Sequence, residues 1–321
     1  MADSTHSDEA GSTTRSEIWF EDGNVVLQAE GTHFKVYRGA LAAHSPIFKD
    51  VFAMPQPPSE GEAAIEGCPV VHLSDTAADV TIVLKALFLL SGHIVAGEPL
   101  DFAVVAAFLR LGKKYEIELL YAEALKRLRY EFPSTLKDLD EYSRHTMIKG
   151  DFRTSADVAK LAREQSLLCV LPLALYQCCC YAGAIFNPVA GITRDAGTTT
   201  MLSAGDFLAC LLAGSSLSKT QVTSTLAWLN APRSTYPKCT SPAPCANIRK
   251  EVLYSIYFPS VNFLGHKCWS EFKYNHIDEV GEMCSSCNAV AEQLHNDGRA
   301  KFWEALPGIF GLSKWAELME E

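Results

Sequence analysis

The feature that most constrains the fold of this chain is a long stretch without a charged side chain, from Gln165 to Thr193. Within it, Leu167 to Phe186 has the length of a membrane span. Against a membrane span, Pro172 lies near the start of the segment, Gln177 and Asn187 interrupt the stretch, and no basic cluster flanks either end. We therefore expect a helix that is apolar all round and lies buried at the centre of a helical domain.

The rest of the composition is that of an ordinary globular protein. A length of 321 residues corresponds to about two domains, and 48% of the residues are hydrophobic while 21% are charged. Asp and Glu outnumber Lys and Arg by 38 to 28, which gives a formal net charge of −10. A chain this acidic gains nothing from contact with a phosphate backbone, so we expect no nucleic-acid partner.

Eleven cysteines are unusual for such a chain, and the compartment decides how to interpret them. Residues 1–16 are rich in Ser and Thr and lack the apolar run of a secretory signal, so we expect a disordered tail there. No Asn-x-Ser/Thr sequence occurs in the chain. These features predict an intracellular protein, in the nucleus or the cytoplasm, with reduced thiols that bind metal or are buried.

Residues 17–132 predict an α+β domain with a small sheet and a helical cluster. Two β-leaning runs flank Gly31-Thr32, which predicts a hairpin, and Ser45-Pro46 predicts the start of a helix. The expected strands are 18–20, 25–30, 33–37 and 70–73. The expected helices are 38–44, a second one from Pro46, one capped by Ser74 or Asp75, and then 101–111 and 116–130, while 54–67 is a loop.

The remainder predicts an all-α C-terminal extension in two parts. Residues 133–235 form a helical domain with a Gly/Thr-rich connector at 187–200, and residues 236–321 form a cysteine-containing helical region. Aromatic residues near the end have helix-like spacing that favours packing over a ligand cage: Phe302, Trp303, Phe310 and Trp315.

No sequence pattern predicts a catalytic site. Gly112-Lys113 lacks the first glycine and the Ser/Thr of a phosphate-binding loop, and the run Ala213 to Leu217 lacks the second glycine of a nucleophile elbow. The nine histidines are scattered, with no His-Glu-x-x-His pair. We therefore expect that the chain is not an enzyme.

The cysteines divide into two groups. Cys178, Cys179 and Cys180 are adjacent on an expected helix, so they fan around it and cannot converge on one metal ion. Together with Cys169 and Cys210 on other apolar stretches, they are expected to be buried as small hydrophobic residues.

The tail cysteines have a different pattern. Cys239-x5-Cys245 lies on a Pro/Ser loop, and Cys284-x2-Cys287 lies ahead of an expected helix at 289–295. Two such pairs can supply the four thiolates of a tetrahedral structural zinc site. His266 and Cys268 are possible substitutes as ligands. Two alternatives remain open: reduced thiols near solvent, or a redox pair formed by Cys284 and Cys287 alone.

The sequence also resembles a known family. Its N-terminal part resembles a BTB/POZ domain in Ile18-Trp19-Phe20, in Phe34 to Arg38 and in Leu41 to Phe48. Glu21 to Glu30 and Gly67 to Leu73 are similar to the BTB proteins of expanded families in mushroom-forming fungi. The resemblance covers nearly the whole chain past residue 16. Two departures are Glu17, where many BTB domains have Asp, and Tyr37 before Arg38, where many have His.

This resemblance implies a protein–protein interaction module that forms a homodimer. It places Glu17 and Arg38 in a charged pocket at the dimer surface, and it gives Ile18, Trp19, Leu41 and Ile47 as apolar contacts. Burial in the core of the monomer is the open alternative for the apolar residues.

Two functions follow from the resemblance. One is an adaptor that recruits a cullin-RING ubiquitin ligase and captures an unknown substrate protein. The alternative is a self-associating scaffold or transcription cofactor without a ligase.

Overall fold

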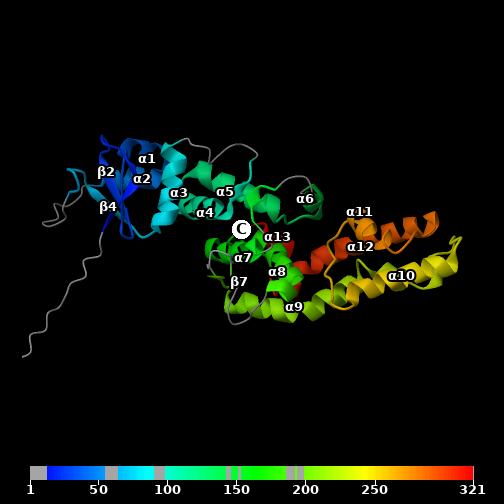
Figure 1. Cartoon of the computed structure of the whole chain (residues 1–321). Helices are drawn as coiled ribbons and strands as arrows, with labels where there is room; N and C mark the ends of the chain where they lie inside the picture. Colours follow the sequence, from blue (N-terminus) through cyan, green and yellow to red (C-terminus); the bar gives the residue numbers. More distant parts are fainter. Residues whose placement is uncertain are drawn as a thin grey trace, which may run out of the picture. The chain divides into compact units, whose positions relative to one another are not determined.

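The computed structural model describes residues 13–54, 64–89, 98–141, 146–150, 153–185, 192–193 and 199–320. The chain divides into two compact units (Figure 1). Unit 1 comprises residues 1–128 and 146–149, and unit 2 comprises residues 129–145 and 150–321. The chain combines a small sheet with many helices, as the sequence predicts.

The sheet of unit 1 has four strands in the order β1-β3-β2-β4. The strands are β1 (Thr14–Trp19), β2 (Val25–Ala29), β3 (Thr32–Val36) and β4 (Val70–Leu73). β2 and β3 form the predicted antiparallel hairpin, β1 runs parallel to β3, and β4 runs parallel to β2. Both outer strands therefore extend a central hairpin.

Strand β1 begins inside the segment 1–16 that was predicted to be a disordered tail. Residues 1–12 of that segment lie outside the described residues, but Thr14 and Arg15 pair with Thr32 and His33. The backbone N–H of Thr14 donates to the carbonyl of Gly31 at 2.7 Å. Backbone pairing of this kind does not require apolar side chains, so composition could not reveal it.

Two short helices follow the hairpin, α1 (Arg38–His44) and α2 (Pro46–Ala53), as predicted (Figure 1). The Ser45 hydroxyl accepts a hydrogen bond from the Phe48 backbone N–H at 3.0 Å, which confirms Ser45 as the cap of α2.

Three longer helices complete the cluster: α3 (Ala77–Phe88), α4 (Phe102–Lys114) and α5 (Glu118–Glu131). The predicted cap of α3, Ser74 or Asp75, is wrong. The cap is Thr76, whose hydroxyl accepts a hydrogen bond from the Asp79 backbone N–H. Ser74 and Asp75 accept hydrogen bonds from the Lys114 ammonium group instead.

A second, two-stranded sheet in unit 1 pairs β5 (Leu100–Asp101) with β6 (Ile148–Lys149) in parallel. The fully buried Arg127 holds both strands, because its Nη1 donates to the carbonyls of Glu98 and Met147, each at 2.7 Å. Residues 146–149 thus belong to unit 1, although the residues before them belong to unit 2.

Unit 2 is mainly helical. Its α-helices are α6 (Leu136–Glu141), α7 (Thr154–Gln165), α8 (Leu171–Ile185), α9 (Ala204–Thr223), α10 (Pro242–Tyr257), α11 (Trp269–Phe272), α12 (Ser285–Ile309) and α13 (Trp315–Leu318). Short turns of other helix types are η2 (Leu168–Val170), η3 (Ala227–Asn230), η4 (Arg233–Thr235) and the π-helix η5 (Lys273–Ile277).

The prediction of an all-α extension needs two corrections. Strand β6, described above, lies within residues 133–235 and pairs with β5. The two-residue strands β7 (Ile192–Thr193) and β8 (Thr199–Thr200) pair in antiparallel fashion within the connector predicted at 187–200. Backbone hydrogen bonding again supplies structure that the polar composition did not indicate.

The charge-free stretch contains η2 and α8, and most of its apolar side chains between Leu167 and Cys179 are buried as expected. Leu171, Leu173, Leu175 and Tyr176 are all at most 1% exposed. Among the described residues, no helix has both the length and the apolar character needed to span a membrane.

Apart from residues 146–149, the regions 133–235 and 236–321, predicted as separate, lie in the same unit. The fully buried Gln221 of α9 shows why. Its Nε2 donates to Asn262 O at 3.0 Å and to Tyr257 Oη at 2.9 Å, and its Oε1 accepts from Leu264 N at 2.9 Å. One side chain therefore joins α9 to the end of α10 and to the loop that follows it.

Candidate metal centre

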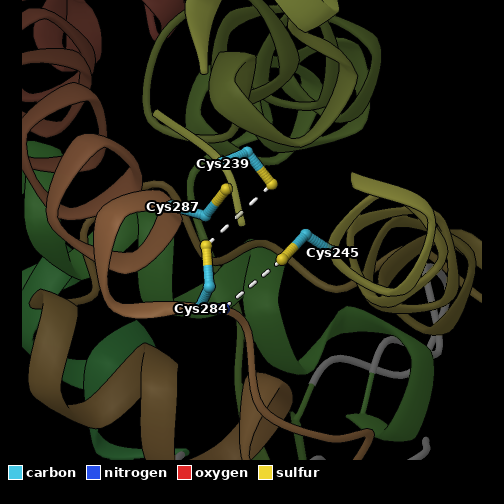
Figure 2. A group of neighbouring side chains, drawn as sticks. All are labelled: Cys239, Cys245, Cys284 and Cys287. Atoms are coloured by element: carbon cyan, nitrogen blue, oxygen red, sulfur yellow. Dashed lines mark hydrogen bonds between the residues drawn. The ribbon is translucent and has the colours of Figure 1, made fainter. Parts of the chain in front are cut away.

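The four tail cysteines come together in unit 2 (Figure 2). The Sγ atoms of Cys239, Cys245, Cys284 and Cys287 all lie within 4.8 Å of one another. Among the described residues, this is the one group of three or more Cys, His, Asp or Glu side chains that is arranged to hold a metal ion. The two sequence pairs thus converge as the spacing predicted.

The first pair is placed by the chain that leads into α10. Cys239 follows η4 in a turn, where its backbone N–H donates to the Tyr236 carbonyl at 3.2 Å. Pro242 stands at the first position of α10, where a missing N–H costs nothing, and Cys245 lies in the first turn of that helix.

The second pair is placed by the start of α12. Cys284 is the residue before the first helical position, and Cys287 lies in the first turn. The backbone N–H of Cys284 donates to the Cys245 sulfur at 3.3 Å, and the sulfurs of Cys284 and Cys239 are 3.9 Å apart (Figure 2). Both contacts connect one pair with the other.

The local electrostatics favour negative charge at the cluster. Two long helices, α10 and α12, begin at the cysteines, so the positive ends of both helix dipoles face the sulfurs. Hydrogen bonds from the backbone N–H groups of Cys287 and Thr240 to the Cys284 sulfur lower the pKa of Cys284 to about 5. Burial raises the pKa of the Cys245 and Cys287 thiols.

The cluster is also part of a hydrophobic core. Cys245 and Cys287 are 1% and 0% exposed and pack with Trp228, Val252 and Phe272, among others. Cys239 and Cys284 pack against the same core but are partly exposed. The inner half of the cluster is therefore enclosed by the core.

Sequence reasoning missed a neighbour of the cluster. Thr240 donates hydrogen bonds to the Cys284 sulfur from both its backbone and its side chain. Its position directly after Cys239 is the signal that could have revealed it. Farther along α10, the nearly buried Arg249 contacts Tyr236 of the surrounding core, with its guanidinium 4.1 Å from the centre of the ring.

The two substitute ligands do not join the cluster. The Nδ1 atom of His266 is 2.9 Å from the Tyr176 hydroxyl, and the Cys268 sulfur is 3.3 Å from the Ser270 hydroxyl. Each side chain therefore has another polar contact, and the ligand set is the four cysteines of the two pairs.

The residues expected at a dimer surface fall into different environments within unit 1. Ile18 and Leu41 are 1% exposed, so the open alternative, burial in the monomer core, describes these two residues. Trp19 and Ile47 are partly exposed.

The two charged members of the expected pocket are both exposed, and the structure gives each of them a contact with another side chain. Glu17 forms an ion pair with Lys85, with 2.5 Å between Oε1 and Nζ. The guanidinium of Arg38 lies over the Phe52 ring at 6.0 Å.

Most of the five cysteines predicted to be buried, and the late aromatic residues, are in the core as predicted. Cys169, Cys178, Cys179 and Cys210 are buried and Cys180 is partly buried. Phe302, Trp303, Phe310 and Trp315 are at most 5% exposed, and the two tryptophan rings stack at 5.1 Å. These aromatic side chains form packing contacts and no open cage.

A comparison with models of protein families and with curated proteins finds no match for this chain. The resemblance to BTB/POZ domains therefore stays a prediction from the sequence. The evidence for the metal centre is the position and burial of the four cysteines.

Proposed function

We propose that this chain is a protein-interaction protein whose unit 2 is organised by a structural zinc ion. The convergence of the four sulfurs carries the metal part of the proposal. Zinc holds thiolates at about 2.3 Å in a tetrahedron, so its ligand sulfurs lie about 3.8 Å apart. The separation of 3.9 Å between Cys239 and Cys284 already fits. The widest separation, at most 4.8 Å, needs to shorten by about 1 Å.

The donor set indicates which metal and which role. Four sulfur ligands favour soft ions, and four protein ligands leave no open position for water, which is typical of structural rather than catalytic zinc. All eleven cysteines are free, so no disulfide competes for the four ligands. Bound zinc would tie the turn before α10 to the start of α12 and thereby stabilise the core that contains Cys245 and Cys287.

Metal analysis of the purified full-length chain tests the zinc site. We expect one zinc ion per chain in the wild type and in Cys268→Ser, which removes a cysteine outside the cluster, and loss of zinc in Cys245→Ser. A chelator should lower the melting temperature of the wild type. Metal-free protein, with a melting temperature that neither zinc nor chelator changes, would refute the site whether or not the variant folds.

The interaction part of the proposal concerns unit 1. Its order of a strand hairpin, two short helices, a fourth strand and further helices is what the resemblance to BTB/POZ domains implies. Ile47 and Val51 of α2 and Met54, the residue directly after the helix, follow one another at spacings of four and three residues, and none of them is buried. Such an apolar stripe on an exposed helix face supports self-association through unit 1.

Light scattering over a concentration series tests self-association. We expect the wild type to form dimers and Ile47→Glu to shift the equilibrium toward monomer, because the new charge would be desolvated in the contact. Lys49→Glu, at an exposed position of the same helix outside the stripe, is the control and should dimerise as the wild type does. A wild type that stays monomeric at high concentration would contradict the proposal.

The ligase question is separate. If the protein is an adaptor for a cullin-RING ubiquitin ligase, a cullin should co-purify with the wild type under gentle lysis and a substrate protein should be captured with it. Self-association without any cullin would favour the alternative of a scaffold or a transcription cofactor.

A further inference from the structure

The four cysteines of the cluster are not equivalent. Cys245 and Cys287 lie in first turns of helices and are 1% and 0% exposed. Cys239 and Cys284 lie outside the helices, in a turn and at a cap position, and both are partly exposed. The cluster therefore has an inner pair that faces the core and an outer pair that solvent reaches.

The sulfurs of the outer pair are also in contact with each other. Cys284 Sγ and Cys239 Sγ are 3.9 Å apart and are joined by a dashed line in Figure 2. A disulfide needs about 2.05 Å between sulfurs, so these atoms must approach by about 2 Å. Because neither residue lies within a helix, changes in side-chain torsion angles and small backbone shifts can supply that approach without breaking α10 or α12.

We propose that Cys239 and Cys284 form an oxidation-sensitive thiol pair, and that hydroperoxides convert this pair to a disulfide and release the metal. The inference rests on the zinc site proposed above. It adds a chemical modification of that site, because two of the four ligands become unable to bind zinc.

The reaction has two steps. In the first, the thiolate of one outer cysteine attacks a peroxide oxygen, the O–O bond breaks, and a sulfenic acid forms while the other oxygen leaves as hydroxide. In the second, the other thiolate attacks the sulfur of the sulfenic acid, the S–S bond forms and the S–O bond breaks, with hydroxide leaving again. The two sulfurs lose two electrons in all and the peroxide gains them. With hydrogen peroxide, two thiolates and one peroxide therefore give one disulfide and two hydroxides, and two protons from the buffer convert the hydroxides to water.

Metal release follows from the loss of ligands. A disulfide sulfur is no longer a thiolate, and Cys245 and Cys287 remain as two ligands where four held the ion. Those two cysteines are 1% and 0% exposed and cannot complete a four-coordinate site by themselves. The core around them then loses the link between the turn before α10 and the start of α12.

The test uses the zinc-loaded full-length chain and hydrogen peroxide as the oxidant. Zinc content is measured first, then zinc release is followed with a chromogenic chelator, and disulfides are mapped by mass spectrometry after alkylation of free thiols. We expect release of the bound zinc together with a disulfide between Cys239 and Cys284, and return of zinc binding after reduction. Cys268→Ser is the matched control, because it removes a partly exposed cysteine outside the cluster, and it should behave as the wild type does.

Three results would overturn the inference without touching the zinc site. The first is zinc that stays bound under peroxide, and the second is zinc release with a disulfide between Cys284 and Cys287 or within the inner pair. The third is release without any disulfide. Absence of zinc before oxidation would instead refute the zinc site itself.

Discussion

Acidification should destabilise unit 2 through a single buried histidine, His295 of α12. Its side chain is 0% exposed, and both ring nitrogens are used: Nε2 donates to the Lys267 carbonyl at 2.8 Å, and Nδ1 accepts from the Trp228 indole N–H at 3.4 Å. A proton on Nδ1 would face the indole N–H and would place a charge in the core. Burial and the nearby Arg299 outweigh the Lys267 carbonyl and lower the pKa of His295 from 6.5 to about 4.

The sign and size of the stability change follow from the difference between the pKa of His295 in the folded and in the unfolded chain. Below pH 6.5, His295 is protonated in the unfolded chain but stays neutral in the folded chain. The free energy of unfolding therefore falls as the pH falls toward 4. Each pH unit in this window costs about 1.4 kcal/mol, so about 2 kcal/mol is lost by pH 5. The contribution is fully present above pH 6.5 and stops declining below the pKa of the folded state.

Urea unfolding monitored by tryptophan fluorescence measures this loss. Four of the five tryptophans lie in unit 2, so the signal reports mainly on that unit. The comparison is the change in unfolding free energy between pH 7.5 and pH 5 in the wild type and in His295→Gln, which cannot titrate. We expect the loss to shrink by about 2 kcal/mol in the variant. His44→Gln, at an exposed histidine of α1, is the control and should leave the loss unchanged.

This comparison removes effects that both proteins share, such as protonation of the cysteine ligands at low pH. An equal loss of stability in the wild type and in His295→Gln would show that His295 is not the group responsible, and the reasoning from its burial would be wrong.

Two further predictions concern packing. Gly298→Ala should destabilise unit 2 by several kcal/mol in thermal unfolding, on the order of a large core defect, because a Cβ there would collide with the Ser224 carbonyl. Gly308→Ala is the control on the same helix. Its Cβ would meet no neighbour, so it should raise the stability by up to about 1 kcal/mol. Arg127→Met should cost unit 1 about 3 kcal/mol or more in urea unfolding, because the carbonyls of Glu98 and Met147 lose their hydrogen bonds from a buried, charged donor and Glu123 loses its ion-pair partner. The exposed Arg129→Met should stay within about 0.5 kcal/mol. A similar result for either variant and its control would contradict the corresponding prediction.

The parts of the fold that the sequence predicted are those that local patterns determine. The hairpin of β2 and β3 follows from two β-leaning runs around Gly31-Thr32, and the start of α2 follows from Ser45-Pro46. The burial of α8 follows from the absence of charge between Gln165 and Thr193. Each of these signals lies within one segment of the chain, so no knowledge of distant contacts was needed.

The missed parts depend on contacts between distant residues. The start of β1 at Thr14 depends on backbone pairing with β3, and β6 depends on Arg127, which lies about twenty residues before it in the chain. The helix expected at 289–295 extends from Ser285 to Ile309, because its second half carries Phe302 and Trp303 into the core. Gly298 interrupts the apolar sequence pattern between these halves. The structure explains the glycine, because the Ser224 backbone lies too close to this position for a Cβ atom.

The metal centre shows the same division. Spacing indicated the four ligands, since each pair lies within a short segment, but it could not show that the core around them draws residues from before the first cysteine. Leu226, Trp228 and Leu229 belong to the region predicted as a separate domain, yet they pack in one core with Cys245 and Cys287.

The same core connects the metal centre with His295, because the Trp228 indole N–H donates a hydrogen bond to the His295 ring. Removal of the metal and protonation of His295 therefore act on the same packed core, so their effects on stability should not add as independent perturbations do. Protonation of the cysteine ligands weakens zinc binding at pH 5 in the wild type and in His295→Gln alike, so the two proteins are compared at that pH. A chelator should cost the wild type less than His295→Gln at pH 5 if the two sites are coupled, and equally much in both proteins if they are independent.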